Sequence, residues 1–230
     1  MRVPIAKEGL WIIVIATAVC AVVAAGLSWI WWPLGLPLLI VWGWVLAFFR
    51  DPNRRCTCQA YELCSPADGT ITEISRLDSE PDFNGPAIRI GMFLSLFNVH
   101  VNRAPCAGRV RVVTYKPGAF LDARHPESGA RNESNTLLID PDGLPGPVRV
   151  RQVAGLVARR IICHAREGDK LAAGERFGMI RFGSRTELII PAFKETEILV
   201  GVGDKVKAGS TVLARQRANG GMEAMPRSGQ

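Results

Sequence analysis

The chain lacks long amphipathic helices after residue 50. No apolar pattern with helical spacing continues there for longer than about three turns, which argues against a parallel sheet covered by helices. Apolar residues instead occur in short alternating runs, separated by glycine, proline and aspartate. This part of the chain is therefore expected to be mainly β.

Histidine is scarce, and cysteine is poorly placed for metal binding. The three histidines are scattered and form no His-x-His pair, which argues against a zinc peptidase. Cys56-x-Cys58 followed by Cys64 could be half of a metal site, but no second Cys/His pair lies at finger-like spacing. We expect no metal. We also expect reduced thiols, because one cysteine lies in a hydrophobic segment and the chain is not a small disulfide scaffold.

Charge is absent from Leu10 to Phe49, a stretch that holds all six tryptophans. A membrane span needs about 20 apolar residues, which Leu10–Ile30 supplies. Trp31-Trp32-Pro33 then predicts a turn, and Leu34–Phe49 would return over only about 24 Å, short of a full span. We predict a hydrophobic helical hairpin that anchors residues 1–50 in a membrane, with monotopic insertion as the alternative.

Positive charge flanks this segment on both sides. The basic residues are Arg2, Lys7, Arg50, Arg54 and Arg55. Their placement predicts that both ends of the segment are cytoplasmic. A signal peptide cleaved near Ala24-Ala25 is the competing interpretation, but a second uncharged stretch follows directly. The formal net charge of +7 favours an acidic partner, without choosing between nucleic acid, anionic lipid and an acidic substrate.

The soluble part contains an internal repeat. Gly168–Gly174 and Gly203–Gly209 share the phrase Gly-Asp-Lys-x-x-x-Gly, and a short apolar run follows each. The phrase resembles the turn of biotinyl/lipoyl-type hammerhead folds, in which two related halves form a flattened β sandwich. Pro66–Ile71 resembles the opening strand of such a half. We predict a hammerhead, or barrel-sandwich-hybrid-like, domain over residues 51–230, with glycines where the backbone needs a positive φ.

A glycine followed by a serine is the candidate for unusual chemistry. Apolar residues alternate on both sides of Gly183-Ser184, which predicts two short strands joined by a tight turn. There the Ser184 hydroxyl can attack the Gly183 carbonyl, because glycine has no side chain to block the approach. The resulting ester can break by elimination, and hydrolysis then leaves a pyruvoyl group and ammonia. The dipeptide alone has little specificity, since Gly-Ser is common in ordinary turns.

Three stretches together resemble the phosphatidylserine decarboxylase family in its short bacterial and archaeal form. They are Ser65–Gly69, Ser95–Pro105 and Arg181–Arg185. Phe48–Pro52, Asn132-Glu133 and the extended run Gly178–Arg185 belong to the same resemblance, which covers the chain from about residue 45 to about residue 215.

The resemblance implies a proenzyme that cleaves itself between Gly183 and Ser184. Residues 1–183 would form the large chain and residues 184–230 the small chain, which together make a heterodimer. The covalent pyruvoyl cofactor derived from Ser184 would form a Schiff base with phosphatidylserine, which loses carbon dioxide to give phosphatidylethanolamine. The partners would be this substrate and membrane lipid, with no nucleic acid, and the catalytic domain would lie on the cytoplasmic side of the inner cell membrane.

The same resemblance suggests roles for an aspartate and a histidine. Asp68 matches the acidic residue of the maturation step, and His100 matches the first histidine of a His-x-x-His pair. Arg103 stands where the long form has the second histidine, which is assigned to self-cleavage. Either His100 serves both stages, or Asp68 acts with another partner.

Arginines are the candidates for substrate binding. Arg103 and Arg185 could hold the phosphate and carboxylate of the lipid, since guanidinium groups suit both, and Arg124 and Arg131 are further candidates. A solvated basic face against anionic lipid explains these residues equally well.

The remaining histidines and a non-catalytic function complete the alternatives. We expect His164 to be structural, and His125 to lie in a polar loop long enough to be a lid. A membrane-anchored carrier or adaptor of the hammerhead type would need a modifiable lysine at a hairpin tip, flanked by methionines. No such lysine is present.

Overall fold

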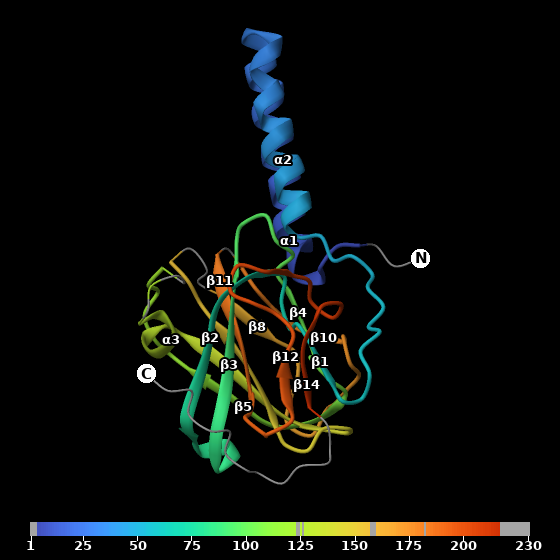
Figure 1. Cartoon of the computed structure of the whole chain (residues 1–230). Helices are drawn as coiled ribbons and strands as arrows, with labels where there is room; N and C mark the ends of the chain where they lie inside the picture. The colour runs from blue at the N-terminus through green and yellow to red at the C-terminus, as the bar shows by residue number, and fades with distance from the viewer. Residues whose placement is uncertain (1–3, 123–124, 126, 157–159, 182, 217–230) are drawn as a thin grey trace. The chain divides into compact units, whose positions relative to one another are not determined.

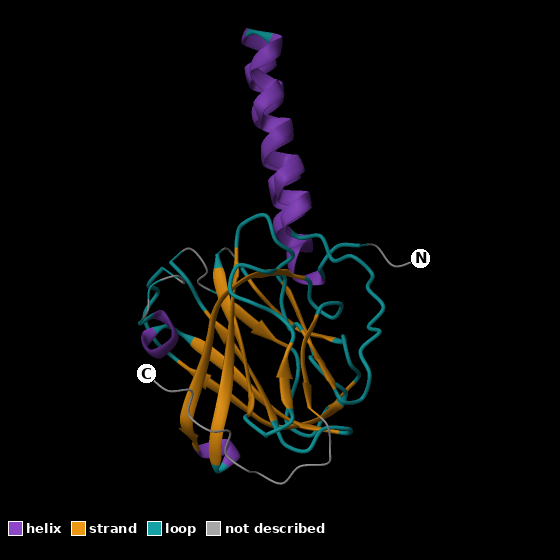
Figure 2. Cartoon of the chain, viewed as in Figure 1, coloured by secondary structure: helices purple, strands orange, loops and turns teal. Residues whose placement is uncertain are grey.

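The structure divides the chain into a helical unit, residues 1–53, and a β unit, residues 54–230. It is a computed structural model that describes residues 4–122, 125, 127–156, 160–181 and 183–216. Figure 1 follows the chain from its N-terminus, and Figure 2 shows that helix dominates the first unit and strand the second.

The helical unit is a hairpin of two apolar helices. The short helix η1 (Lys7–Gly9) leads into α1 (Leu10–Ile30), and η2 (Trp32–Gly35) leads into α2 (Leu36–Phe48). With 21 residues α1 is about 32 Å long, enough to cross a membrane, whereas the 13 residues of α2 reach only about 20 Å. Trp42 Nε1 donates to Thr17 Oγ1 at 2.9 Å and joins the two helices. The predicted hydrophobic hairpin is confirmed.

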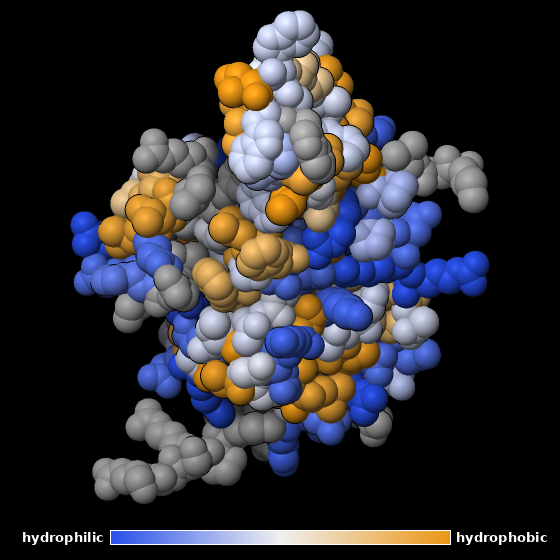
Figure 3. Space-filling model, turned by 90° about the horizontal axis from the view of Figure 1, so that it is seen from above, coloured by the Kyte–Doolittle hydropathy of each residue, from blue (hydrophilic) through white to orange (hydrophobic). Residues whose placement is uncertain are grey.

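The apolar side chains of α1 are not buried. No residue of α1 is buried, and Trp29 and Ile30 at its end are 93% and 77% exposed. Orange side chains on the helical unit in Figure 3 mark this hydrophobic surface. A surface of this kind is costly in water and suits hydrocarbon, which is consistent with membrane association.

The β unit contains one large and two small sheets. The large sheet has the order β13-β2-β3-β11-β7-β6-β5-β9, and all its neighbouring strands are antiparallel. The small sheets have the orders β1-β14-β12 and β4-β10-β8. The strands are β1 (Glu62–Cys64), β2 (Gly69–Glu80), β3 (Gly85–Leu94), β4 (Val101–Arg103), β5 (Gly108–Lys116), β6 (Ser134–Pro141), β7 (Val148–Val153), β8 (Ile161–Cys163), β9 (Lys170–Leu171), β10 (Arg176–Ile180), β11 (Ser184–Pro191), β12 (Thr196–Ile198), β13 (Lys205–Val206) and β14 (Val212–Gln216); the helices are η3 (Pro81–Phe83) and α3 (Ser128–Arg131).

The main core lies on one face of the large sheet. Ile90, Leu188 and Val150 occupy one row across β3, β11 and β7, and all three are fully buried. They belong to one hydrophobic cluster with Phe177 of β10 and Leu213 of β14. The two small sheets therefore cover this face, as the alternating apolar pattern requires. The prediction of a mainly β domain is confirmed.

The internal repeat forms both edges of the large sheet. β9 of the first copy pairs with β5, and β13 of the second copy pairs with β2. The glycines that bound the copies, Gly168, Gly174, Gly203 and Gly209, all have positive φ, as predicted. A Cβ built on Gly209 would lie 3.2 Å from the Gly174 Cα, so the turns beside the two edges meet. The sheet is therefore curled, in agreement with the predicted hammerhead-like fold.

Candidate active site

The Gly183-Ser184 bond lies where the chain changes sheets. β10 pairs with β4 and β8, whereas β11 lies between β3 and β7 in the large sheet. Gly183 has a φ of +63°, a left-handed conformation that residues with a side chain rarely adopt. The predicted turn between two strands is present, but it joins two sheets instead of forming a hairpin. Phe182 lies outside the described residues.

Ser184 is the first residue of β11 and is fully buried. It pairs with Leu94, the last residue of β3. Its Oγ is shielded from solvent and makes no hydrogen bond with any residue that the structure describes. Most buried hydroxyl groups in folded proteins have a hydrogen-bond partner, so a buried hydroxyl without one is unusual.

His100 lies at the same end of the sheet as Ser184. It is fully buried immediately before β4, and its carbonyl oxygen accepts a hydrogen bond from Ile180 N at 3.2 Å. Ile180 leads within four residues to Ser184, and the Ser184 partner Leu94 leads within six residues to His100. Two connections therefore bring the predicted histidine and serine into one region.

Asp68 lies across β3 from Ser184. It is buried in the turn before β2, where Thr70 pairs with Phe93. Because the next residue of β3 pairs with Ser184, two strand spacings separate Asp68 from Ser184, or about 10 Å. The structure thus places both at the same end of the sheet without bringing their side chains into contact by any described hydrogen bond.

The Asp68 carboxylate is held by two donors. Arg54 forms a two-pronged ion pair with it, in which Nη2 donates to Oδ2 at 2.8 Å and Nη1 donates to Oδ1. The Ala208 N–H also donates to Oδ1, at 2.8 Å. Sequence reasoning missed Arg54, because this residue lies in an irregular segment whose only signal was its positive charge.

A buried amide network ties the sheets together beneath Ser184. Asn102 Nδ2 donates to Thr186 Oγ1 at 3.2 Å and to the Pro66 carbonyl at 3.3 Å. Gln152 Nε2 donates to Asn102 Oδ1 at 2.9 Å, and Asn135 Nδ2 donates to Gln152 Oε1 at 3.1 Å. Asn102 therefore links β4, β7, β11 and the turn before Asp68. No periodic pattern in the sequence signalled this network.

Strand alternation connects the network to the candidate residues. Thr186 is two residues after Ser184, so both side chains lie on the same face of β11. Asn102 is two residues after His100 on the β4 run. The contact between Asn102 and Thr186 therefore fixes the spacing between the His100 and Ser184 segments.

The two predicted substrate-binding arginines already have protein partners. Arg103 Nη1 donates to the Gly174 carbonyl at 3.0 Å, in a turn of the internal repeat. Arg185 points to the face opposite Ser184, where its Nε donates to Glu187 Oε1 at 2.8 Å and its Nη2 pairs with Glu73. Burial lowers the pKa of the Arg185 guanidinium, but the two carboxylates outweigh burial and raise the pKa above its ordinary value. A role of these arginines in substrate binding stays a prediction.

The other polar candidates lie on the surface. His125 and His164 are exposed, and His125 Nδ1 accepts a hydrogen bond from Glu127 N at 3.2 Å. Arg131 pairs with Glu127 at 2.9 Å. Arg124 lies outside the described residues. None of these contacts connects them to Ser184.

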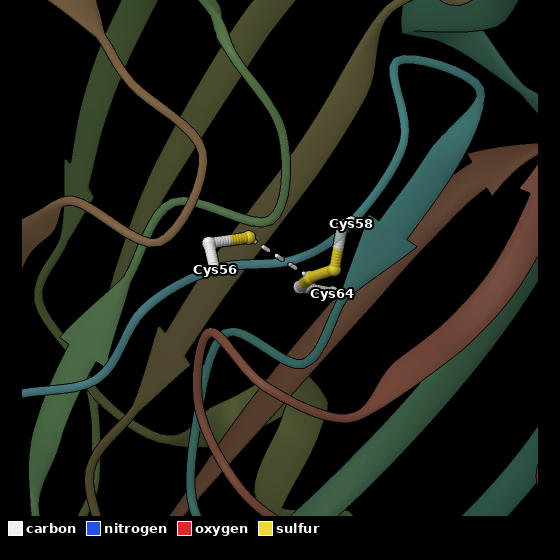
Figure 4. A group of neighbouring side chains, drawn as sticks. All are labelled: Cys56, Cys58 and Cys64. Carbon is white, nitrogen blue, oxygen red and sulfur yellow. Dashed lines mark hydrogen bonds between the residues drawn. A yellow bond between two sulfur atoms is a disulfide. The ribbon is translucent and has the colours of Figure 1, made fainter.

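Three cysteines form a separate cluster, shown in Figure 4. Cys58 and Cys64 are joined by a disulfide, so the expectation of reduced thiols is wrong for these two residues. The sequence argument weighed the whole chain, whereas the fold brings these two particular residues together. The Cys56 thiol lies 3.3 Å from Cys64 Sγ.

Comparison with known proteins identifies the relatives of this chain. The model of the phosphatidylserine decarboxylase family matches residues 42–214. A phosphatidylserine decarboxylase proenzyme of Rhodopirellula baltica is 46% identical over 213 residues, which cover 92% of this chain and 88% of the relative. The proenzymes of Beijerinckia indica and Nitrosomonas eutropha are 44% and 42% identical, over 86% and 93% of this chain and 85% and 95% of the respective relatives.

Removing the central amide of the network should destabilise the β unit. Asn102→Ala removes the buried hydrogen bonds that Asn102 makes with Gln152 Nε2 and Thr186 Oγ1, and we expect a loss of about 1–3 kcal/mol in the free energy of unfolding. Asn135→Ala, at the end of the same network, should cost less because Asn135 has a single partner in it. Denaturant unfolding of both variants measures the difference. Equal losses would contradict the central position of Asn102.

Proposed function

The chain belongs to the phosphatidylserine decarboxylase family, and from this premise we propose that it decarboxylates phosphatidylserine with a pyruvoyl group made from its own Ser184. The observation that carries the proposal is the buried Ser184 hydroxyl, which has no hydrogen-bond partner among the described residues and directly follows a left-handed glycine. The decarboxylase activity follows from the family. Self-cleavage and the pyruvoyl group are inferred from this local geometry and from the proenzyme character of the relatives.

Maturation would begin with attack of Ser184 Oγ on the Gly183 carbonyl carbon. The new C–O bond forms as the C–N bond breaks, the hydroxyl proton is transferred to the released amine, and an ester results. A base then removes the Ser184 α-proton, and the Cβ–Oγ bond breaks to leave a Gly183 carboxylate and dehydroalanine. Hydrolysis of the dehydroalanine releases ammonia and leaves the pyruvoyl group.

His100 is our candidate for the proton transfer to the product carbon during decarboxylation. The backbone connections through Ile180 and Leu94 support this choice, because both lead from the His100 segment to the Ser184 strand. Imidazole suits both taking and returning a proton near neutral pH. Arg103 is not proposed to replace a second histidine in proton transfer, because a guanidinium group keeps its protons near neutral pH.

Asp68 is proposed to act on maturation by positioning the turn that carries it. Its carboxylate holds Arg54 and the Ala208 N–H, and Pro66 in the same turn accepts from Asn102. Asn102 in turn contacts Thr186 on the face of Ser184. Asp68 therefore reaches Ser184 through this chain of contacts, across about 10 Å of sheet.

Cleavage would leave the two chains bound to each other. The strands after residue 184 include β11, which pairs with β3 and β7, and β14, which pairs with β1. These ladders are unaffected by breaking one peptide bond at the start of β11. We therefore propose a heterodimer of residues 1–183 and 184–230, in which the pyruvoyl group would begin the small chain.

The pyruvoyl group, once formed, would supply an electron sink next to the bond between the substrate α-carbon and its carboxylate, which breaks as carbon dioxide leaves. The protein would bind the headgroup, exclude water through the burial of the Ser184 region, and provide a proton to the product carbon. Burial favours this chemistry because electrostatic interactions are stronger in a water-poor site.

The substrate implies that the site works next to a bilayer. The apolar hairpin would anchor the protein in the inner cell membrane, with the β unit on the cytoplasmic side, given the basic residues that flank the hairpin. Phe97 supports a membrane-facing position for the site. It is 74% exposed, and it lies in the loop between Leu94, the partner of Ser184, and His100.

Replacing the attacking hydroxyl tests maturation. Ser184→Ala should remain a single chain without decarboxylase activity, because no oxygen is available to form the ester. Gel electrophoresis and carbon dioxide release report the two effects. Ser134→Ala, which removes another buried serine hydroxyl, should still give two chains. Splitting of the Ser184→Ala chain at this bond would contradict the proposal.

Substitutions at Asp68 and His100 separate the two stages. Asp68→Ala should block or greatly slow cleavage, whereas His100→Ala should leave two chains yet lower turnover. Asp204→Ala, which alters the aspartate of the second repeat turn, serves as the control. The measurements are the fraction of cleaved chain over time and the carbon dioxide released per cleaved molecule. Full cleavage and full activity in both variants would remove these residues from the site.

A negative charge in place of Phe97 tests whether the site faces the membrane. Phe97→Glu should lower activity on phosphatidylserine vesicles by about tenfold. The substitution removes an apolar contact with lipid, and the negative membrane surface repels the new carboxylate. Activity on a soluble short-chain phosphatidylserine should change little. Val202→Glu is a matched control, since Val202 is 66% exposed in a turn of the repeat. An equal vesicle effect in both variants would contradict the placement.

A further inference from the structure

The three-cysteine cluster lies outside the site described above. Cys56 and Cys58 belong to the irregular segment that precedes β1, and Cys64 is the last residue of β1. The three sulfur atoms lie within 4.8 Å of one another. In Figure 4, Cys64 lies between Cys56 and Cys58, bonded to one and hydrogen-bonded to the other.

Cys64 is the fixed member of the cluster. It is fully buried, its N–H donates to the Pro105 carbonyl at 2.8 Å, and it pairs with Val212 of β14. Cys56 and Cys58 are only partly buried, and both lie outside the strands. A backbone of this kind can present either of two sulfur atoms to Cys64.

The free thiol is already in contact with the disulfide. Because Cys64 Sγ carries no hydrogen in its disulfide, the Cys56 thiol is the donor across the 3.3 Å separation. The free thiol of Cys106 is in a different environment, since burial, assisted by Asp142, raises its pKa to about 12. Cys106 is therefore a thiol at neutral pH, and unreactive.

We propose that Cys56, Cys58 and Cys64 form a thiol–disulfide exchange site in which Cys64 is shared between two alternative disulfides. The Cys56 thiolate attacks Cys64 Sγ, and a Cys56–Cys64 bond forms. The Cys58–Cys64 bond breaks, its electron pair passes to Cys58 Sγ, and Cys58 takes up the proton that Cys56 lost. One disulfide and one thiol are present before and after, so the step needs no oxidant.

The exchange would alter the irregular segment before β1, in which Arg54 pairs with the Asp68 carboxylate. The present disulfide closes a sequence separation of 6 residues, and the alternative would close the longer segment from Cys56 to Cys64. Cys56 lies two residues after Arg54, whose guanidinium pairs with the Asp68 carboxylate. The partly exposed Cys56 and Cys58 would also admit an external partner, a small thiol or a dithiol protein. A disulfide of this type matches a reducing compartment, where such bonds are mostly transient.

Differential alkylation of the full-length protein tests the exchange without using its activity. Free thiols are blocked with N-ethylmaleimide under mildly acidic quench, the disulfides are then reduced, and the released thiols are labelled with iodoacetamide. All three cysteines lie in one tryptic peptide, Cys56–Arg76, so fragmentation of this peptide locates each label. In a glutathione buffer we expect the maleimide label to be divided between Cys56 and Cys58, with Cys64 unlabelled.

Two variants test separately whether each of the two disulfides can form. Cys58→Ser, treated with oxidised glutathione as the oxidant, should form the Cys56–Cys64 disulfide and lose the maleimide label from both residues. Cys56→Ser should keep only the Cys58–Cys64 disulfide and show no label in this peptide. Cys163→Ser, outside the cluster, should leave the wild-type division of label unchanged.

Several results would overturn the proposal. Label confined to Cys56 in the wild type at every glutathione ratio would show a static disulfide beside an inert thiol. Label on both Cys56 and Cys64 in oxidised Cys58→Ser would show that the alternative bond cannot form. Label on all three cysteines of the wild type in oxidised buffer, or protection of all three by stoichiometric zinc, would also exclude the exchange site.

Discussion

The passage of the chain between two sheets at Gly183 is the constraint on which the candidate site depends. β10 ends in a small sheet and β11 begins in the large one, so the backbone must turn without a continuous ladder. A φ of +63° at Gly183 makes this turn, and a Cβ there would meet no atom within 4 Å. The need for glycine is therefore conformational. The same turn delivers Ser184 into a buried position at the first ladder pair of β11.

Buried amide side chains hold the small sheet and the large sheet together near this turn. Asn102 contacts the side chain of Thr186 and, through Gln152, a second strand of the large sheet. Unpaired buried polar groups are costly, so the network resists any sliding of the small sheet over the large one. The proposed self-cleavage would depend on a precise separation of these groups, since a shift of about 1 Å can cost much of the rate. Stability and reactivity thus rest on the same contacts.

The sequence predicted those features that depend on local patterns. Alternation identified the strands, the repeated Gly-Asp-Lys phrase identified two related turns, and the absence of charge from Leu10 to Phe49 identified the hairpin. Positive φ at Gly168 and Gly203 follows from the same pattern, because turns of this kind need residues without a Cβ. The resemblance to the phosphatidylserine decarboxylase family rested on a combination of motifs, and the family comparison confirms the family.

Contacts between distant segments could not be predicted in this way. The Asn102 network depends on how strands from different parts of the chain pack, and the pairing of Arg54 with Asp68 and the Cys58–Cys64 disulfide depend on the path of the irregular segment before β1. The face on which Arg185 lies required the register of β11, which places Ser184 inward and Arg185 outward. Arg185 is next to Ser184 in sequence, but its side chain therefore lies on the opposite face of the sheet from that of Ser184.

The most direct test of the central claim is the intact mass of the purified wild-type protein. The account predicts two chains, one of residues 1–183 with a terminal carboxylate and one of residues 184–230. The small chain should be lighter by one ammonia than the encoded segment and blocked to N-terminal sequencing. A single uncut chain, or a small chain that begins with a free serine, would contradict it.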